Sequence, residues 1–169
     1  MLASGIAYAS DQWSSFFSAE VSAAAALTGL LFVAVSINLA KIISFANLPP
    51  KAARALVTLI GILFAASLCL VPGQPTRMLG WELTILGTIF WGTITFLQRS
   101  HSYENPYMNR MQKLLGTLLA QISELPIIVC GVSLLCRRGG GLYWMVSAVI
   151  VSFASAVFDT WVLLVEILR

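Results

Sequence analysis

The chain contains five long apolar stretches, and each is separated from the next by a short segment of turn-forming or charged residues. The stretches cover residues 17–44, 52–71, 79–98, 114–136 and 141–168. A helix that crosses a bilayer needs about 20 mostly apolar residues, and it satisfies its backbone polar groups internally. The sequence therefore predicts an all-α integral membrane protein, a single polytopic domain over residues 1–169 built as a bundle of about five transmembrane helices.

The composition excludes a water-soluble fold and several classes of function. Charged residues make up only 10% of the chain, whereas soluble domains carry about 25%. No basic cluster is interleaved with aromatic residues, so we expect no nucleic-acid partner. The Gly-x-Ser-x-Gly, His-Glu-x-x-His and Gly-rich phosphate-binding motifs are absent from the sequence, so we expect neither an enzyme nor a bound cofactor or metal.

The basic residues are distributed unevenly between the two predicted membrane sides. Seven of the ten lie at or near the first loop, the third loop and the C terminus: Lys41, Lys51, Arg54, Arg99, Arg110, Lys113 and Arg169. The other side has only Arg77, Arg137 and Arg138. Because cytoplasmic loops carry an excess of Lys and Arg, we expect an outside N terminus and a cytoplasmic C terminus.

Five carboxylates lie in or against the apolar stretches, and the sequence places no Lys or Arg deep in any stretch to pair with them. They are Glu20, Glu82, Glu124, Asp159 and Glu166. A charged group at the bilayer centre costs roughly 2.5–3.5 kcal/mol on insertion scales. Such a group must be protonated, paired, hydrated or used to hold a cation, so these acids are the candidate functional residues.

Glu124 is the most informative of these acids. It lies eleven residues beyond Lys113, about 16 Å along a helix and thus near the membrane centre. Thr117 and Gln121 share its helical face, and Pro126 removes a backbone hydrogen bond and predicts a kink. Two interpretations stay open: a proton or cation site at Glu124 with Gln121, or a protonated Glu that donates a structural hydrogen bond between helices.

The remaining acids are weaker candidates for an ion path. Asp159 shares a face with Ser152 and Ser155 in the inner half of the last stretch, surrounded by apolar residues. Glu166 is expected to pair with Arg169 at the inner surface. Glu20 and Glu82 lie at outer ends of their stretches, where they either stabilise the first turn of a helix or form an acidic pore mouth.

Small residues predict close helix packing on two faces. Ser22, Ala25, Ala26 and Gly29 share one side of the first stretch, and Gly80, Thr84, Thr88 and Gly92 are four residues apart in the third. Such spacing lets helix backbones approach closely, and two such faces suit a homo-oligomer. Among the three cysteines, Cys69 and Cys136 fall near outer ends, where a disulfide and ordinary packing of free thiols both stay open.

Four segments resemble a group of short bacterial multi-span membrane proteins that have no established activity. They are FSAEVSAAAALTGLLFVAVSINLAK at 17–41, LVPGQ at 70–74, GGGLYW at 139–144 and WVLLVEILR at 161–169. The resemblance covers about a third of the chain. It implies a protein of the bacterial inner membrane and assigns no site.

These features lead to two hypotheses of different classes. The first is a homo-oligomeric channel or transporter for protons or small cations that uses intramembrane carboxylates. Glu124 is its central site, which Gln121 and the kink at Pro126 shape. Asp159 is a second site on the inner side, and Glu20 and Glu82 lie at the outer mouth. The alternative is a scaffold or regulatory subunit that binds other membrane proteins and transports nothing.

Overall fold

The computed structural model describes residues 5–45, 48–104 and 110–168, and the secondary structure of this part of the chain consists of helices joined by turns, with no strand. A short 3-10 helix, η1 (Ser10–Trp13), precedes α2 (Ser14–Ile37) and α3 (Leu39–Ser44). The remaining helices are α4 (Leu48–Cys69), α5 (Thr76–Glu104), α6 (Arg110–Cys136) and α7 (Tyr143–Leu168). The expected all-α fold is confirmed.

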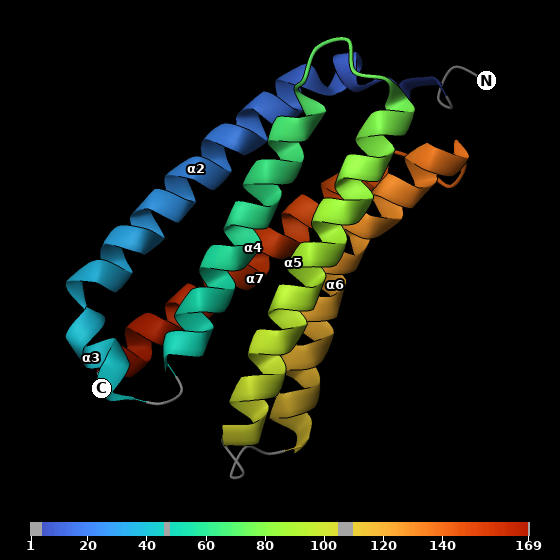
Figure 1. Ribbon diagram of the computed structural model, residues 1–169. Helices are drawn as coiled ribbons and strands as arrows, with labels where there is room; N and C mark the ends of the chain where they lie inside the picture. Colours follow the sequence, from blue (N-terminus) through green and yellow to red (C-terminus); the bar gives the residue numbers. More distant parts are fainter. Residues whose placement is uncertain (1–4, 46–47, 105–109, 169) are drawn as a thin grey trace.

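The five long helices form two layers (Figure 1). α2, α4 and α5 lie side by side in the front layer, and α7 and α6 lie behind α4 and α5. The main buried cluster is built mostly from α4, α5, α6 and α7, with Ile62, Leu83, Leu134 and Met145 fully buried. α2 adds only Phe17, Ala24 and Leu31 as buried residues, so it is a peripheral helix with most of its surface exposed.

Proline and glycine set the helix boundaries. Pro49 and Pro50 lie in the first turn of α4, where the missing backbone N–H costs nothing because that group has no helical partner. Gly73, with φ of 67°, turns the chain between α4 and α5. Gly139, Gly140 and Gly141 all have positive φ between α6 and α7, a conformation that glycine adopts without steric cost.

The N-terminal segment closes one end of the bundle over this glycine loop. The backbone N–H of Leu142 donates to the carbonyl of Ala7 at 2.8 Å, and the rings of Trp13 and Tyr143 meet edge to face with centroids 4.9 Å apart. A Cβ atom at Gly141 would lie only 2.1 Å from the Ala7 oxygen. Glycine at this position is therefore required for the contact between the two segments.

Two predicted boundaries differ from the structure. The first apolar stretch is divided at Asn38, which has φ of −102° and ψ of 12° and whose side-chain amide donates to the carbonyl of Ala34. This local hydrogen bond competes with helix continuation, so α3 starts a separate helix. The polar segment 99–113 is also partly helical, because α5 continues to Glu104 and α6 begins at Arg110.

Within the described ranges, three helical segments are long and apolar enough to cross a membrane by length and composition: Ser10–Ile37, Leu48–Cys69 and Tyr143–Val165. The apolar part of α6, Gln121–Cys136, is shorter. Membrane insertion fits these helices, and the count of five crossings stays a prediction.

The two predicted small-residue faces differ in whether another helix packs against them. A Cβ atom at Gly131 of α6 would lie 2.6 Å from the backbone nitrogen of Thr84 and 2.8 Å from the Gly80 oxygen of α5. The predicted close approach is therefore present over this half of α5. In contrast, Gly92 and Gly29 have no atoms within 4 Å of an added Cβ, and the small residues of α2 face outward.

Candidate functional site

Glu124 lies in the interior of the bundle on α6. Its side chain is 1% exposed, and both carboxyl oxygens are buried without a hydrogen-bond partner in the described part of the chain. The hydroxyl of Thr58 on α4, itself 3% exposed, faces the carboxyl closely enough to interact with it. No bond of good hydrogen-bonding geometry joins them. Both carboxyl oxygens are therefore free to bind a proton or to accept a hydrogen bond.

A serine of α7 adds a second polar contact beside Glu124. The hydroxyl of Ser152, which is fully buried, donates to the backbone carbonyl of Ser123 at 3.3 Å. The residue next to Glu124 in sequence is therefore joined to α7, while Thr58 approaches the carboxyl from α4. Polar groups from three helices converge on this one level of the bundle.

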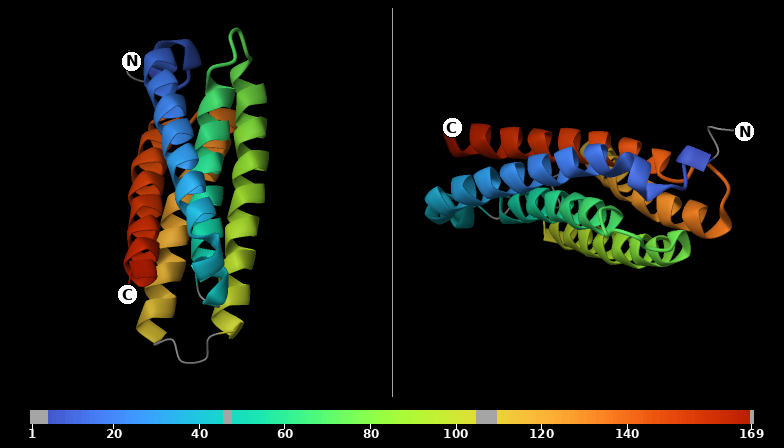
Figure 2. Two further views of the ribbon diagram at one scale, coloured as in Figure 1. Left: turned by 90° about the vertical axis from the view of Figure 1, so that its left-hand side faces the viewer. Right: turned by 90° about the horizontal axis from the view of Figure 1, so that it is seen from above.

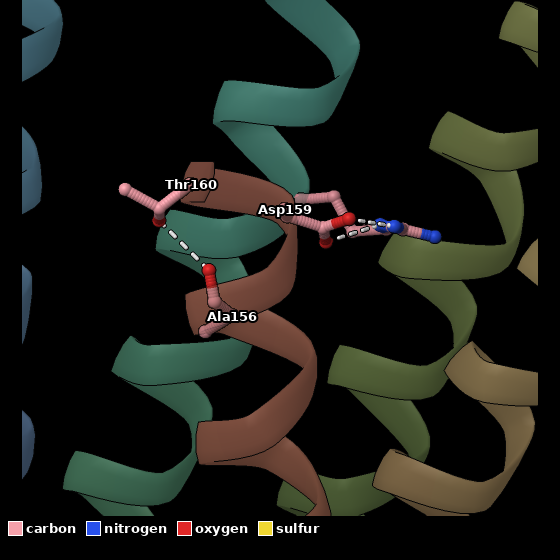
Figure 3. A network of polar contacts seen from close by, with 4 residues as sticks. Ala156, Asp159 and Thr160 are labelled. Carbon is pink, nitrogen blue, oxygen red and sulfur yellow. Dashed lines mark hydrogen bonds and ion pairs between the residues drawn. The ribbon is translucent and has the colours of Figure 1, made fainter. Parts of the chain in front are cut away.

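Asp159 lies about 10 Å further along α7, because it follows Ser152 by two helical turns. Its carboxylate accepts a hydrogen bond from Nε of Arg54 at 2.9 Å and forms an ion pair with the second guanidinium nitrogen of the same residue. Figure 3 shows the Asp159 carboxylate directed away from the side of α7 that carries Thr160. The expectation that no basic residue pairs with these acids is wrong for Asp159.

The sequence contained a signal for this pair. Arg54 lies inside the predicted stretch 52–71 and four residues before Thr58, so both share one face of α4. That face meets α6 at Thr58 and α7 at Arg54. The place of Arg54 near the start of this stretch also fits the basic first loop, because a long basic side chain near a helix end can extend its charge toward the membrane surface, so position alone does not reveal the partner.

Gln121 has a different partner from the one expected. Its side-chain oxygen accepts a hydrogen bond of 2.5 Å from the indole nitrogen of Trp91 on α5. Glu124, in contrast, faces α4. Gln121 therefore joins α6 to α5, and the side chain of Thr117 lies outside the described residues.

Pro126 lies within α6, which stays a single α-helix through this position. Figure 1 shows that α6 changes direction along its length. Ile127, the next residue, is 1% exposed, so this part of α6 packs inside the protein, where an interrupted backbone hydrogen bond is tolerated.

Glu20 and Glu82 lie toward the end of the bundle that carries η1. Each is the seventh residue of its helix and neither is in the first turn, so the expected helix-dipole role is wrong because both helices start earlier than predicted. Glu82 accepts a hydrogen bond of 2.5 Å from the Gln74 amide. One oxygen of Glu20 is buried without a hydrogen-bond partner among the described residues.

Several further expectations concern cysteines, metals and the C terminus. All three cysteines are free, with Cys69 and Cys130 buried and Cys136 exposed, so no disulfide joins Cys69 to Cys136 in this structure. No group of three or more His, Cys, Asp or Glu side chains is placed to hold a metal within the described ranges. The pairing of Glu166 with Arg169 lies outside the described residues.

The site therefore consists of two levels: Glu124 with Thr58 and the Ser123–Ser152 contact, and the Arg54–Asp159 ion pair nearer the basic end.

No protein family, no curated protein and no solved structure matches this chain.

Proposed function

We propose that the chain is a multi-pass membrane protein that transports protons, or small cations, through the carboxyl group of Glu124. The distribution of polarity supports insertion into a bilayer. Large apolar side chains such as Leu30, Ile37 and Phe96 are about 70% exposed on the outside (68%, 77% and 72%), whereas Glu124 and Asp159 are buried inside. A lipid environment accommodates this surface, and water does not.

The proposed arrangement has five crossings of the bacterial inner membrane, with the N terminus outside and the C terminus in the cytoplasm. η1 and the last turns of α7 lie at opposite ends of the bundle in Figure 1, as an odd number of crossings requires. Lys41, Lys51 and Arg54 lie toward one end, and Arg77 and Arg137 lie toward the other. The excess of basic residues at the first end gives the orientation.

The observation that carries the proposal is the buried, unpartnered carboxyl of Glu124. Ionisable groups inside a membrane are costly, and they recur in proton relays and ion pathways. A single carboxyl group can bind a proton by itself, whereas a metal cation needs several oxygen ligands, and no group of three or more His, Cys, Asp or Glu side chains that could hold one is present in the described part of the chain. Protons are therefore the preferred substrate.

The other acids have secondary roles in this proposal. Asp159 is held by Arg54 and exchanges a proton only when that ion pair opens, which makes it an inner station. Glu20 and Glu82 attract cations to the outer mouth. Gln121 and Pro126 fix the position of α6 beside the site. The outward face of α2 with Ser22, Ala25, Ala26 and Gly29 supports assembly into a homo-oligomer.

The test is proton flux into liposomes that contain the purified chain, driven by a potassium diffusion potential and read with an enclosed pH indicator. Glu124→Gln keeps the size of the side chain and removes its proton-binding group, so we expect flux to fall to the level of empty liposomes. Glu124→Asp should retain part of the flux. Thr88→Val is the control, because Thr88 is exposed on α5 and bonds only to its own helix at Thr84.

Normal flux in Glu124→Gln would exclude Glu124 as the central site. Liposomes that contain well-assembled wild-type protein and stay impermeable to protons would exclude proton transport. Sodium or potassium flux measured on the same preparation would then decide between cation transport and no transport.

A second candidate function is a non-transporting scaffold for other membrane proteins. It is favoured by α2, which buries only three residues within the bundle and leaves a small-residue face uncovered. A stable heteromeric complex after gentle extraction, together with sealed liposomes, would support it. Recovery of a homo-oligomer alone that conducts protons would exclude it.

A further inference from the structure

The N-terminal segment, residues 5–13, joins the two loops at the η1 end of the bundle, which is the outer end in the proposed orientation. It reaches the loop between α6 and α7 through the bond from the Leu142 N–H to the Ala7 carbonyl. It reaches the other loop at the next residue, because the hydroxyl of Thr76 at the start of α5 donates to the Tyr8 carbonyl at 3.3 Å. Figure 1 and the left view of Figure 2 show the segment, in dark blue, at the top of the bundle beside the α4–α5 loop.

The segment also covers the end of the main buried cluster. Ala7 is 4% exposed, and the side chains of Tyr8 and Trp13 pack against the cluster. Trp13 holds the segment in one conformation, because its indole nitrogen donates to the carbonyl of Ile6 at 2.9 Å and its ring meets that of Tyr143. The segment is therefore a fitted cover over this end of the helices.

The interior of the bundle is apolar between Glu124 and this cover. Leu83 of α5 and Met145 of α7 are fully buried in the same cluster. Among the described residues, Ser133 is the one polar residue that is buried as a whole on this side of Glu124, and its hydroxyl already makes two bonds within the glycine loop. A charge pays a large desolvation cost in such a region, so a proton needs water there to pass.

Polar groups lie in the other direction from Glu124. Trp91 of α5 bonds to α6 about one turn inward of Glu124. Thr95 lies one turn further along α5, and its buried hydroxyl has no hydrogen-bond partner in the described part of the chain. The Arg54–Asp159 pair is also on this side, with the arginine side chain 16% exposed. The closed end of the site is therefore the outer end.

We propose that the N-terminal segment is the outer gate of the proton path, and that this structure is its closed state. The inference rests on the proposed function. Release of the segment uncouples the α4–α5 loop from the α6–α7 loop, so that the outer halves of these helices can separate and admit water toward Glu124. The contacts that hold the segment are few and local, so the gate opens without unfolding of the bundle.

The test combines release of the segment with the proton-flux assay in liposomes. Gly141→Ala places a Cβ atom 2.1 Å from the Ala7 oxygen, and Trp13→Leu removes the indole bond and the ring contact without a change at any glycine. Gly73→Ala is the matched control, because it has a left-handed backbone and no neighbour within 4 Å. Hydrogen exchange of residues 5–13 in the same proteoliposomes reports release of the segment independently of flux.

We expect Gly141→Ala and Trp13→Leu each to raise hydrogen exchange of residues 5–13. Proton flux should rise about fivefold in both, the shift of a closed–open equilibrium that follows loss of one hydrogen bond. Gly73→Ala should match the wild type in both measurements. Gly141→Ala combined with Glu124→Gln should return flux to the level of empty liposomes, because the opened path still depends on the carboxyl group.

Raised exchange with unchanged flux would overturn the gate and leave transport through Glu124 standing. Flux in the combined variant above that of empty liposomes would also overturn it, since protons would then leak past a disrupted bundle. Unchanged exchange in both Gly141→Ala and Trp13→Leu would show that these contacts do not hold the segment, and the gate would be wrong for that reason. Absence of flux in the wild type and in every variant would instead overturn the proposed function.

Discussion

Arg54 and Asp159, which are 105 positions apart in the chain, form a two-point contact between α4 and α7. Their side chains are only 16% and 6% exposed, so the pair lies inside the bundle. A buried ion pair gains little over an apolar pair of the same size, because both charges lose their hydration. Removing one partner is different, since it leaves an uncompensated charge in the interior.

Asp159→Ala should therefore destabilise the protein by about 3 kcal/mol. The free energy of unfolding can be measured by titrating the purified chain in mild detergent with a denaturing detergent. The matched comparison is the double variant Arg54→Met with Asp159→Leu, which removes both charges and should recover most of the loss. If the double variant is no more stable than Asp159→Ala, the ion pair itself contributes net stability and the present interpretation is wrong.

Gly131→Ala should destabilise the contact between α5 and α6 by about 2 kcal/mol, the usual effect of overpacking a helix interface. The added Cβ would lie 2.4 Å from the hydroxyl oxygen of Thr84 and 2.6 Å from its backbone nitrogen, and backbone atoms yield little. Gly92→Ala is the control on α5, with open space around its Cβ. Thermal unfolding of both variants tests this, and equal melting temperatures would contradict the close approach.

Gly141→Ala should release the N-terminal segment from the loop between α6 and α7. The Cβ would lie 2.1 Å from the carbonyl oxygen of Ala7, which breaks the nearby bond from Leu142 to Ala7. Gly73→Ala has the same left-handed strain, with φ of 67° against 54°, and no neighbour within 4 Å. Hydrogen exchange of residues 5–13 should therefore rise in Gly141→Ala and stay at the wild-type level in Gly73→Ala. A rise in both variants would indicate that left-handed backbone strain, and not the contact with Ala7, releases the N-terminal segment.

Glu124→Met should make the protein more stable and inactive at the same time. Met has a similar volume and no polar oxygen, and an unsatisfied buried polar group costs about 1–3 kcal/mol. We expect a gain of about 1 kcal/mol in the free energy of unfolding, together with loss of proton flux. A functional residue that costs stability behaves in this way. A destabilised Glu124→Met would instead indicate that the carboxyl group has a structural role in joining α6 to α4.

Local sequence signals predicted the helical segments well. Pro49 and Pro50, Gly73, and the glycines at 139–141 break the apolar stretches where the structure has its turns, because each residue acts on the backbone at its own position. The four-residue spacing of Gly80 and Thr84 likewise indicated a close helix approach. In contrast, the break between α2 and α3 at Asn38 depends on a side-chain bond to the carbonyl of Ala34 that residue spacing alone does not reveal.

By itself, the sequence determined that this chain is helical, that its helices are long and apolar, and that a few acids lie within them. Only the tertiary structure decided which acid has a partner. Asp159 and Glu124 look alike in sequence, but α4 directs Arg54 to Asp159 and Thr58 to Glu124. The reason is physical: hydrophobic period and backbone propensity act over a few residues, whereas the pairing of buried charges depends on how helices far apart in the chain pack and rotate against one another.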